Sequence, residues 1–336
     1  MAISKRLSIW ASTILILAPL AAAQSYSVTD LGTFLGGTVS QGYGINVLGQ
    51  VAGYARFADF NAHGFFWSQP TGLLDLGSIP PQTNFSVGQA INSFSDVAGY
   101  SYYDRSFNQL AVLWSHGTVR DLGTLPGGSY SQANGINDLG EVTGYSNGAG
   151  QPHAVLWNKQ GVIQDLGTLP GGYSQGLGIN LQGEVIGFSN AANGNWFGFL
   201  WTQSTGMKAL PMLPGANTAS ANGINDLGQI VGGSGYYAVL WHNDRKHTAE
   251  SLGAVSGQKG STAFAINDAG QVVGWSGAVA FVWSREHGMQ DLNKLIPGNS
   301  GWSLTLATAI NAQGQITGQG TINGQQHAFL LTPVSH

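Results

Sequence analysis

Two carboxylates, Asp59 and Asp104, are the side chains of this sequence that most resemble a catalytic pair. They belong to the few acidic residues that do not recur at a fixed repeat position, and they alone occupy equivalent loops of adjacent repeats. General acid–base hydrolysis of a sugar polymer requires two carboxyl groups within about 5–10 Å of each other. The residues around them are charged or aromatic: Arg56, Tyr102, Tyr103 and Arg105. This cluster is therefore a candidate site for catalysis or for binding.

The same residue types also suit binding without catalysis. Trp196 and Trp302 lie outside the repeated Trp position, and each precedes a strand at the same end of its repeat. Aromatic rings can stack on sugar faces, while Asp and Arg supply directional hydrogen bonds. We find no Ser-His-Asp elbow, Gly-rich phosphate loop or metal motif. We therefore expect a non-catalytic binding or scaffold protein without cofactor or metal, which recognises carbohydrate or another surface polymer. A glycoside hydrolase or polysaccharide lyase using Asp59 and Asp104 is the alternative.

An internal repeat positions these residues. The dipeptide Ile-Asn occurs seven times, and successive Asn residues are 46, 45, 43, 45, 42 and 44 positions apart. One copy, residues 131–167, reads as four short strands joined by Gly, Asn and Pro turns. No window has a convincing helical period. Four strands in about 44 residues is the spacing of propeller blades, so we predict an all-β, seven-bladed propeller over residues 24–336.

The chain ends predict a closed ring. Residues 25–32 match the fourth strand of a repeat, whereas residues 327–331 match a third strand. We expect the N-terminal strand to complete the last blade, because that pairing removes two open sheet edges. The first strand of each repeat carries Gly or Ala two positions apart, as at Ala133 and Gly135, which suits the crowded centre of a ring.

Residues that recur at one repeat position are more often structural than catalytic. The repeated Trp position is predicted to form the core between blades. His63, His153 and His327 share another position, but they belong to different repeats and cannot converge on a metal unless they face the axis. The Asp residues before Leu-Gly, and those after the repeated Asn, are expected to accept backbone N–H groups in their own turns. The Trp position holds Trp67, Trp114, Trp157, Trp201, Trp241 and Trp283, with Leu331 in the seventh repeat.

The repeats resemble the HAF family of bacterial extracellular repeat proteins. The tripeptide that names the family stands at 327–329, with variants at 153–155 and 63–65, and the Ile-Asn-x-x-Gly-x-Val-x-Gly and Asp-Leu-Gly elements accompany it. The resemblance covers residues 25–331 and implies an exported repeat protein. It implies no reaction and no catalytic residues. The fifth repeat departs most, because Ala209-Leu210-Pro211 replaces Asp-Leu-Gly.

The N-terminus and the composition predict where the protein acts. Lys5 and Arg6 precede an apolar stretch that ends in Ala21-Ala22-Ala23, which is the pattern of a signal peptide cleaved after residue 23. We expect a secreted or periplasmic protein without a membrane span, and the absence of Cys excludes a lipid-anchor Cys and disulfides. Without Lys5 and Arg6 the formal net charge changes from −4 to −6, which disfavours nucleic acid as a partner. An extracellular glycan or protein is the expected partner.

Overall fold

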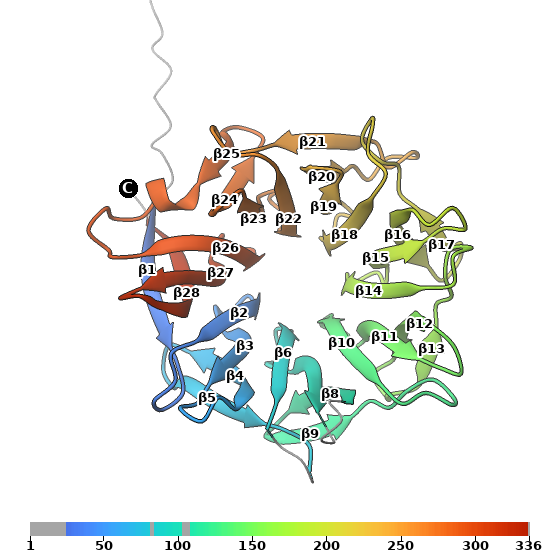
Figure 1. The fold of residues 1–336 in the computed structure, drawn as a ribbon, viewed down its shortest axis with the longest axis horizontal. Helices are drawn as coiled ribbons and strands as arrows, with labels where there is room; N and C mark the ends of the chain where they lie inside the picture. Colours follow the sequence, from blue (N-terminus) through green and yellow to red (C-terminus); the bar gives the residue numbers. More distant parts are fainter. Residues whose placement is uncertain (1–24, 81–83, 103–107, 335–336) are drawn as a thin grey trace, which may run out of the picture.

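The strands form seven four-stranded antiparallel sheets arranged around one axis (Figure 1). The structure, a computed structural model, describes residues 25–80, 84–102 and 108–334. The predicted signal peptide, residues 1–23, lies outside the described residues. Among the described residues, no helix is long and apolar enough to span a membrane. The predicted seven-bladed propeller is confirmed.

Each blade begins with its innermost strand and ends at the rim (Figure 1). The innermost strands are β2 (Ser40–Ile45), β6 (Ser86–Ile91), β10 (Ser131–Ile136), β14 (Ser174–Ile179), β18 (Ala219–Ile224), β22 (Ser261–Ile266) and β26 (Ser303–Ile310). The second strands are β3 (Val51–Arg56), β7 (Val97–Tyr102), β11 (Val142–Asn147), β15 (Val185–Asn190), β19 (Ile230–Ser234), β23 (Val272–Ser276) and β27 (Ile316–Ile322). The third strands are β4 (Ala62–Ser68), β8 (Gln109–Ser115), β12 (Pro152–Trp157), β16 (Trp196–Thr202), β20 (Tyr237–Trp241), β24 (Val279–Ser284) and β28 (Gln325–Val334). The outer strands are β5 (Gly72–Gly77), β9 (Thr118–Asp121), β13 (Ile163–Asp165), β17 (Gly206–Ala209), β21 (Ala249–Gly253), β25 (Gly288–Asp291) and β1 (Ser25–Gly32). We number the blades 1 to 7 in this order, and a short 3-10 helix, η1 (Leu292–Lys294), follows β25.

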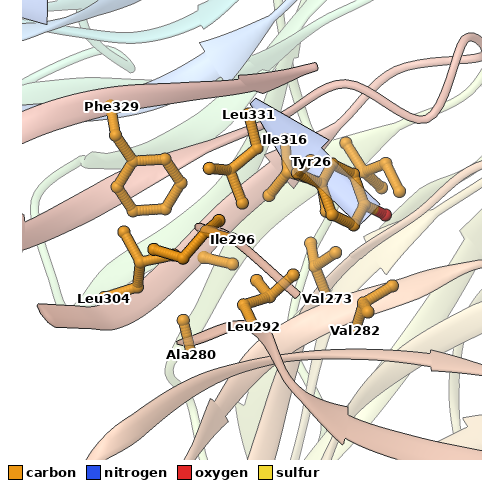
Figure 2. Packing of buried hydrophobic residues seen from close by; sticks show 12 residues of the cluster. Tyr26, Val273, Ala280, Val282, Leu292, Ile296, Leu304, Ile316, Phe329 and Leu331 are labelled. Atoms are coloured by element: carbon orange, nitrogen blue, oxygen red, sulfur yellow. The ribbon is translucent and has the colours of Figure 1, made fainter. Parts of the chain in front are cut away.

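The N-terminal strand closes the ring. β1 pairs antiparallel with β28, from Ser25 opposite Val334 to Gly32 opposite Ala328. Tyr26 is only 1% exposed and packs in a cluster that joins blades 6 and 7 (Figure 2). Its backbone N–H donates to the carbonyl of Leu295 at 2.8 Å. The strand therefore completes blade 7 and also attaches that blade to blade 6.

Small residues let the innermost strands approach each other. A Cβ atom added to Gly135 would lie 3.2 Å from the Cα of Gly178 in the next blade, and one added to Gly223 would lie 2.6 Å from the carbonyl oxygen of Phe264. Larger side chains would push neighbouring blades apart. The prediction that these positions face a crowded centre is therefore confirmed.

The repeated Trp position lies in the core, as predicted. All six Trp residues there are at most 8% exposed, and Leu331 of blade 7 is fully buried. Trp157, for example, packs in a cluster with Leu113 and Leu122 of the preceding blade. These rings fill the space between blades and are not available to a ligand.

The repeated Asn residues form a closed ring of hydrogen bonds around the axis. Each side-chain amide donates to the backbone carbonyl of the equivalent Asn in the following blade, and all seven side chains are buried. The last link, from Asn311 to the carbonyl of Asn46, measures 3.0 Å and joins blade 7 to blade 1. The other links run from Asn46 to Asn92 (2.9 Å), Asn92 to Asn137 (3.5 Å), Asn137 to Asn180 (3.0 Å), Asn180 to Asn225 (3.3 Å), Asn225 to Asn267 (3.1 Å) and Asn267 to Asn311 (3.0 Å).

The same Asn side chain also builds the turn that follows it. The Oδ1 of Asn137 accepts the N–H groups of Leu139 and Glu141, while its amide donates to the carboxylate of Glu141 at 2.8 Å. The expectation that the next residue, Asp138, serves its own turn is wrong. Its carboxylate accepts the N–H and hydroxyl of Ser93 in the preceding blade, because Asn137 already occupies the N–H groups of the turn. In the same way the carboxylate of Asp226 accepts the N–H of Leu181 in the preceding blade, and that of Asp268 accepts the N–H of Asp226.

Deleting residues 25–32 should destabilise the protein far more than removing residues 333–336. The deletion leaves β28 with an open edge and removes Tyr26, and loss of a buried aromatic alone costs about 3–5 kcal/mol. Thermal unfolding of the two truncated proteins measures the difference. A melting temperature for the N-terminal deletion within a degree or two of the intact protein would show that β1 does not close the ring.

Asn137→Ala should lower the free energy of unfolding by about 2–4 kcal/mol, because it leaves buried backbone groups of two blades without a partner. Asn158→Ala is the matched control. The Oδ1 of Asn158 accepts two N–H groups in the same turn geometry, but within a single blade and near the surface. We expect the control to lose less than about 1 kcal/mol. Equal losses for both variants in urea denaturation would mean that the contact between blades contributes nothing.

Candidate functional site

The strand directions define two faces. The loop-rich face carries the loops that lead into the innermost strands and the loops between second and third strands. The turn face carries the Asn turns and the loops between third and outer strands. The residues Arg56, Asp59, Tyr102 and Trp196 belong to the loop-rich face, since each lies at the end of a second strand, in the loop that follows it, or at the start of the third strand. Trp302 belongs to the same face because it lies in the loop that leads into the innermost strand β26.

The candidate cluster around Asp59 and Asp104 is described only in part. Asp59 is exposed, and its carboxylate accepts the backbone N–H of Asn61 at 3.1 Å and its side-chain amide at 2.8 Å. Arg56 is exposed at the end of β3. Tyr103, Asp104 and Arg105 lie outside the described residues. Within the described part of the chain, Asp59 thus serves its own turn.

The two predicted off-repeat Trp residues have different surroundings. Trp196 is 37% exposed at the start of β16. Trp302 is half-buried, and its ring meets that of Phe329 edge-on at 6.1 Å, beside the cluster of blades 6 and 7. Trp196 therefore presents a surface to solvent, while much of Trp302 serves to pack blade 7.

Aromatic rings gather on the loop-rich face of blades 1 to 4. In blades 2, 3 and 4 a ring just before the innermost strand packs against a ring of the second strand, and blade 1 has a similar pair. Phe85 stacks on Tyr102 at 4.6 Å, and Trp196 lies 5.3 Å from Tyr173. We call this set the aromatic arc. Its members are Tyr43, Tyr54, Phe85, Tyr100, Tyr102, Tyr130, Tyr145, Tyr173, Phe188 and Trp196.

Burial raises the pKa of several tyrosine hydroxyls of the arc, among them those of Tyr43, Tyr100 and Tyr145. Burial raises the pKa of Tyr100, and the hydroxyls of Tyr102 and Tyr43 raise it further. Burial likewise raises the pKa of Tyr145 to about 12, although a hydrogen bond from Gln109 opposes the shift. Such hydroxyls can donate and accept hydrogen bonds but cannot act as bases near pH 7.

Two adjoining hollows lie between blades 4 and 6, next to the end of the aromatic arc. Their volumes are about 340 and 350 Å³, and both are lined by Thr218 and Gly235. Trp196 and Phe188 line one of them, and Tyr236 and Tyr237 line the other. We call the two hollows together the recess.

Sequence reasoning found Tyr102 and Trp196 but missed the rest of the arc and the two tyrosines of the recess. The missed signal was the residue that follows Val-x-Gly or Ile-x-Gly in each second strand. That position holds Tyr54, Tyr100, Tyr145 and Phe188 in blades 1 to 4 and Trp275 in blade 6, whereas blade 5 has Gly233. An aromatic residue at the same position of four successive blades indicates an aromatic surface, and not only a structural pattern.

The repeated His residues form pairs within single blades. His63, His153 and His327 lie 2.8–3.0 Å from Asp75, Asp165 and Asp30 of the neighbouring outer strand. Burial raises the pKa of Asp75, but hydrogen bonds from His63 and from the N–H of Gly77, together with the charge of His63, outweigh it and lower that pKa overall. Within the described residues no three His, Cys, Asp or Glu side chains come close enough to hold a metal ion.

The turn face has hollows of a different character. One of about 260 Å³ lies on the axis, inside the ring of Asn residues. A larger one, of about 650 Å³, lies between blades 4 and 5 beside Lys208, Arg245 and Lys246, whose side chains are exposed. No Phe, Tyr or Trp among the described residues lines either hollow, so the aromatic rings distinguish the loop-rich face from the turn face.

Solved structures share the fold of this chain. The extracellular domain of BT4673 from B. thetaiotaomicron matches 93% of it with a TM-score of 0.57 and 10% identity. TolB from Acinetobacter baumannii matches 85% of it with a TM-score of 0.49 and 11% identity. The matches cover only 40% and 64% of those two chains, so this chain spans less than two thirds of their length. No protein-family model and no curated protein matches the sequence. At such low identity the likeness to BT4673 shows the fold alone, and it agrees with the seven-bladed β-propeller observed here.

Proposed function

We propose that this protein is a secreted, non-catalytic binding protein that recognises carbohydrate through the loop-rich face. The aromatic arc is the observation that carries the proposal. Binding sites for small molecules are mostly apolar and aromatic, with a few polar groups that fix orientation. The arc has this composition, with half-buried rings beside tyrosine hydroxyls and the amide groups of Gln132 and Gln175.

The absence of charged side chains from the aromatic arc favours a sugar over an ionic partner. The arc consists of uncharged side chains, and the whole chain has few charges and a negative balance. Nucleic acid would require clustered Lys and Arg. A sugar ring offers apolar C–H groups to an aromatic ring and hydroxyls to polar neighbours, so arc and ligand would be complementary.

Export and family membership are parts of the same proposal. The basic start, apolar stretch and Ala21-Ala22-Ala23 support cleavage after residue 23 and delivery to the periplasm or the exterior. The repeated motifs support membership of the HAF family. A polysaccharide-degrading enzyme gains no support from the described residues, because the Asp59 carboxylate is occupied by Asn61.

Native affinity gels containing dextran, mannan, laminarin, alginate or polygalacturonate test the proposal. We expect at least one polysaccharide to retard the protein, and Tyr102→Ala to weaken that retardation several-fold, because it removes the ring stacked on Phe85. Arg245→Ala on the turn face is the control and should migrate like the parent protein.

Three results would contradict the proposal. Retardation by none of the polysaccharides would argue against carbohydrate as the ligand. Loss of binding in Arg245→Ala but not in Tyr102→Ala would place the site on the turn face. Release of reducing ends or unsaturated sugars from the polymers would favour the enzyme.

A further inference from the structure

We propose that the recess between blades 4 and 6 is the principal subsite for the glycan and that it takes an uncharged pyranose. This inference rests on the proposed carbohydrate function and names the class of sugar and the residues that hold it. It depends on three observations: a missing ring, a shortened loop and an uncharged lining.

The missing ring is at Gly233. This residue of β19 stands at the position that holds Tyr54, Tyr100, Tyr145 and Phe188 in blades 1 to 4. A Cβ atom added to Gly233 would meet nothing closer than the Thr262 side chain at 3.6 Å, an ordinary contact. Packing therefore does not forbid a side chain there, and its absence leaves room beside Phe188.

A shortened loop opens the same place to solvent. In blade 4 five residues, 191–195, connect the second and third strands, whereas blades 5, 6 and 7 use two, which in blade 5 are Gly235 and Tyr236. Tyr236 is 86% exposed, and Tyr237 is 46% exposed. With Trp196 at 37%, three rings from two blades border the recess and remain open to water.

The lining matches a neutral sugar. None of the described residues that line the recess is charged, and its polar side chains include Asn217, Thr218, Ser220 and Thr262. Rings can cover the C–H face of a pyranose while hydroxyl and amide groups bond its rim. A uronate carboxylate would lose water without gaining a cation, which disfavours acidic glycans. Each hollow falls within the roughly 300–1,000 Å³ range of small-molecule sites.

Blade 5 is also where the repeat pattern is weakest. Ala209-Leu210-Pro211 replaces Asp-Leu-Gly directly before it, and Tyr237 takes the position of His63, His153 and His327. The Asn ring and the buried Trp241 are nevertheless kept. The changes thus alter the surface of the blade while its core follows the common design.

Gly233→Tyr is the decisive variant, since it introduces the Tyr that blades 1, 2 and 3 carry at this position and should fill the recess without disturbing the fold. Affinity gels with the neutral polymers dextran, mannan and laminarin, and with the acidic polymers alginate and polygalacturonate, give the readout. We expect retardation by a neutral polymer, weakened roughly tenfold or more by Gly233→Tyr and by Tyr236→Ala. Tyr102→Ala, remote from the recess, should weaken it less. Melting temperatures of all variants should stay near that of the parent protein.

Other outcomes separate the failure of this inference from failure of the proposed function. If Gly233→Tyr and Tyr236→Ala bind normally while Tyr102→Ala does not, the protein binds glycans but the recess is not the subsite. Preference for alginate or polygalacturonate would overturn the neutral assignment alone. If no polymer retards the parent protein, both proposals fail. If Tyr236→Ala instead abolishes self-association in sedimentation, the recess is an interface between two copies.

Discussion

The circle of hydrogen bonds between the repeated Asn residues ties every blade to the next and ends where it began. An Asn side chain suits this position because it has two donor hydrogens and an acceptor oxygen with two lone pairs. In Asn137 all of these are used: two bonds shape its own turn, one holds Glu141, and one reaches Asn180 in the next blade. Asp could not donate to the neighbouring carbonyl. The same side chain therefore determines both the local turn and the spacing of the blades.

This shared inner framework leaves the loops free to differ. The Asn ring, the small residues of the innermost strands and the buried Trp position recur around the axis, so each blade is held in place by residues far from the loop-rich face. Blade 5 keeps that framework but has no ring at Gly233, and only two residues connect its second and third strands, against five in blade 4. The recess exists because a rigid blade lacks side chains that other blades carry. It is therefore largely preformed, which lowers the entropy lost when a ligand binds.

Closure of the ring matters more here than in a protein with disulfides. The sequence has no Cys, so packing and hydrogen bonding must provide its stability. β1 contributes an outer strand to blade 7 and places Tyr26 in the cluster with Leu292 and Phe329 (Figure 2). The chain ends thereby stabilise each other, and the last Asn bond, from Asn311 to Asn46, joins blade 7 to blade 1 on the inside of the ring.

The sequence by itself determined the number of blades, the closing strand, the buried Trp position and the crowded centre. Each of these leaves a signal that repeats every 42–46 residues, and repetition separates structure from chance. It could not show that Asp138 bonds to Ser93 or that Gly233 leaves a recess beside Phe188. Those relations join residues of different blades, and only the radial arrangement decides which side chains meet across the gap. Tertiary structure therefore decided the candidate site, because the site consists of differences between blades, whereas the fold consists of what the blades share.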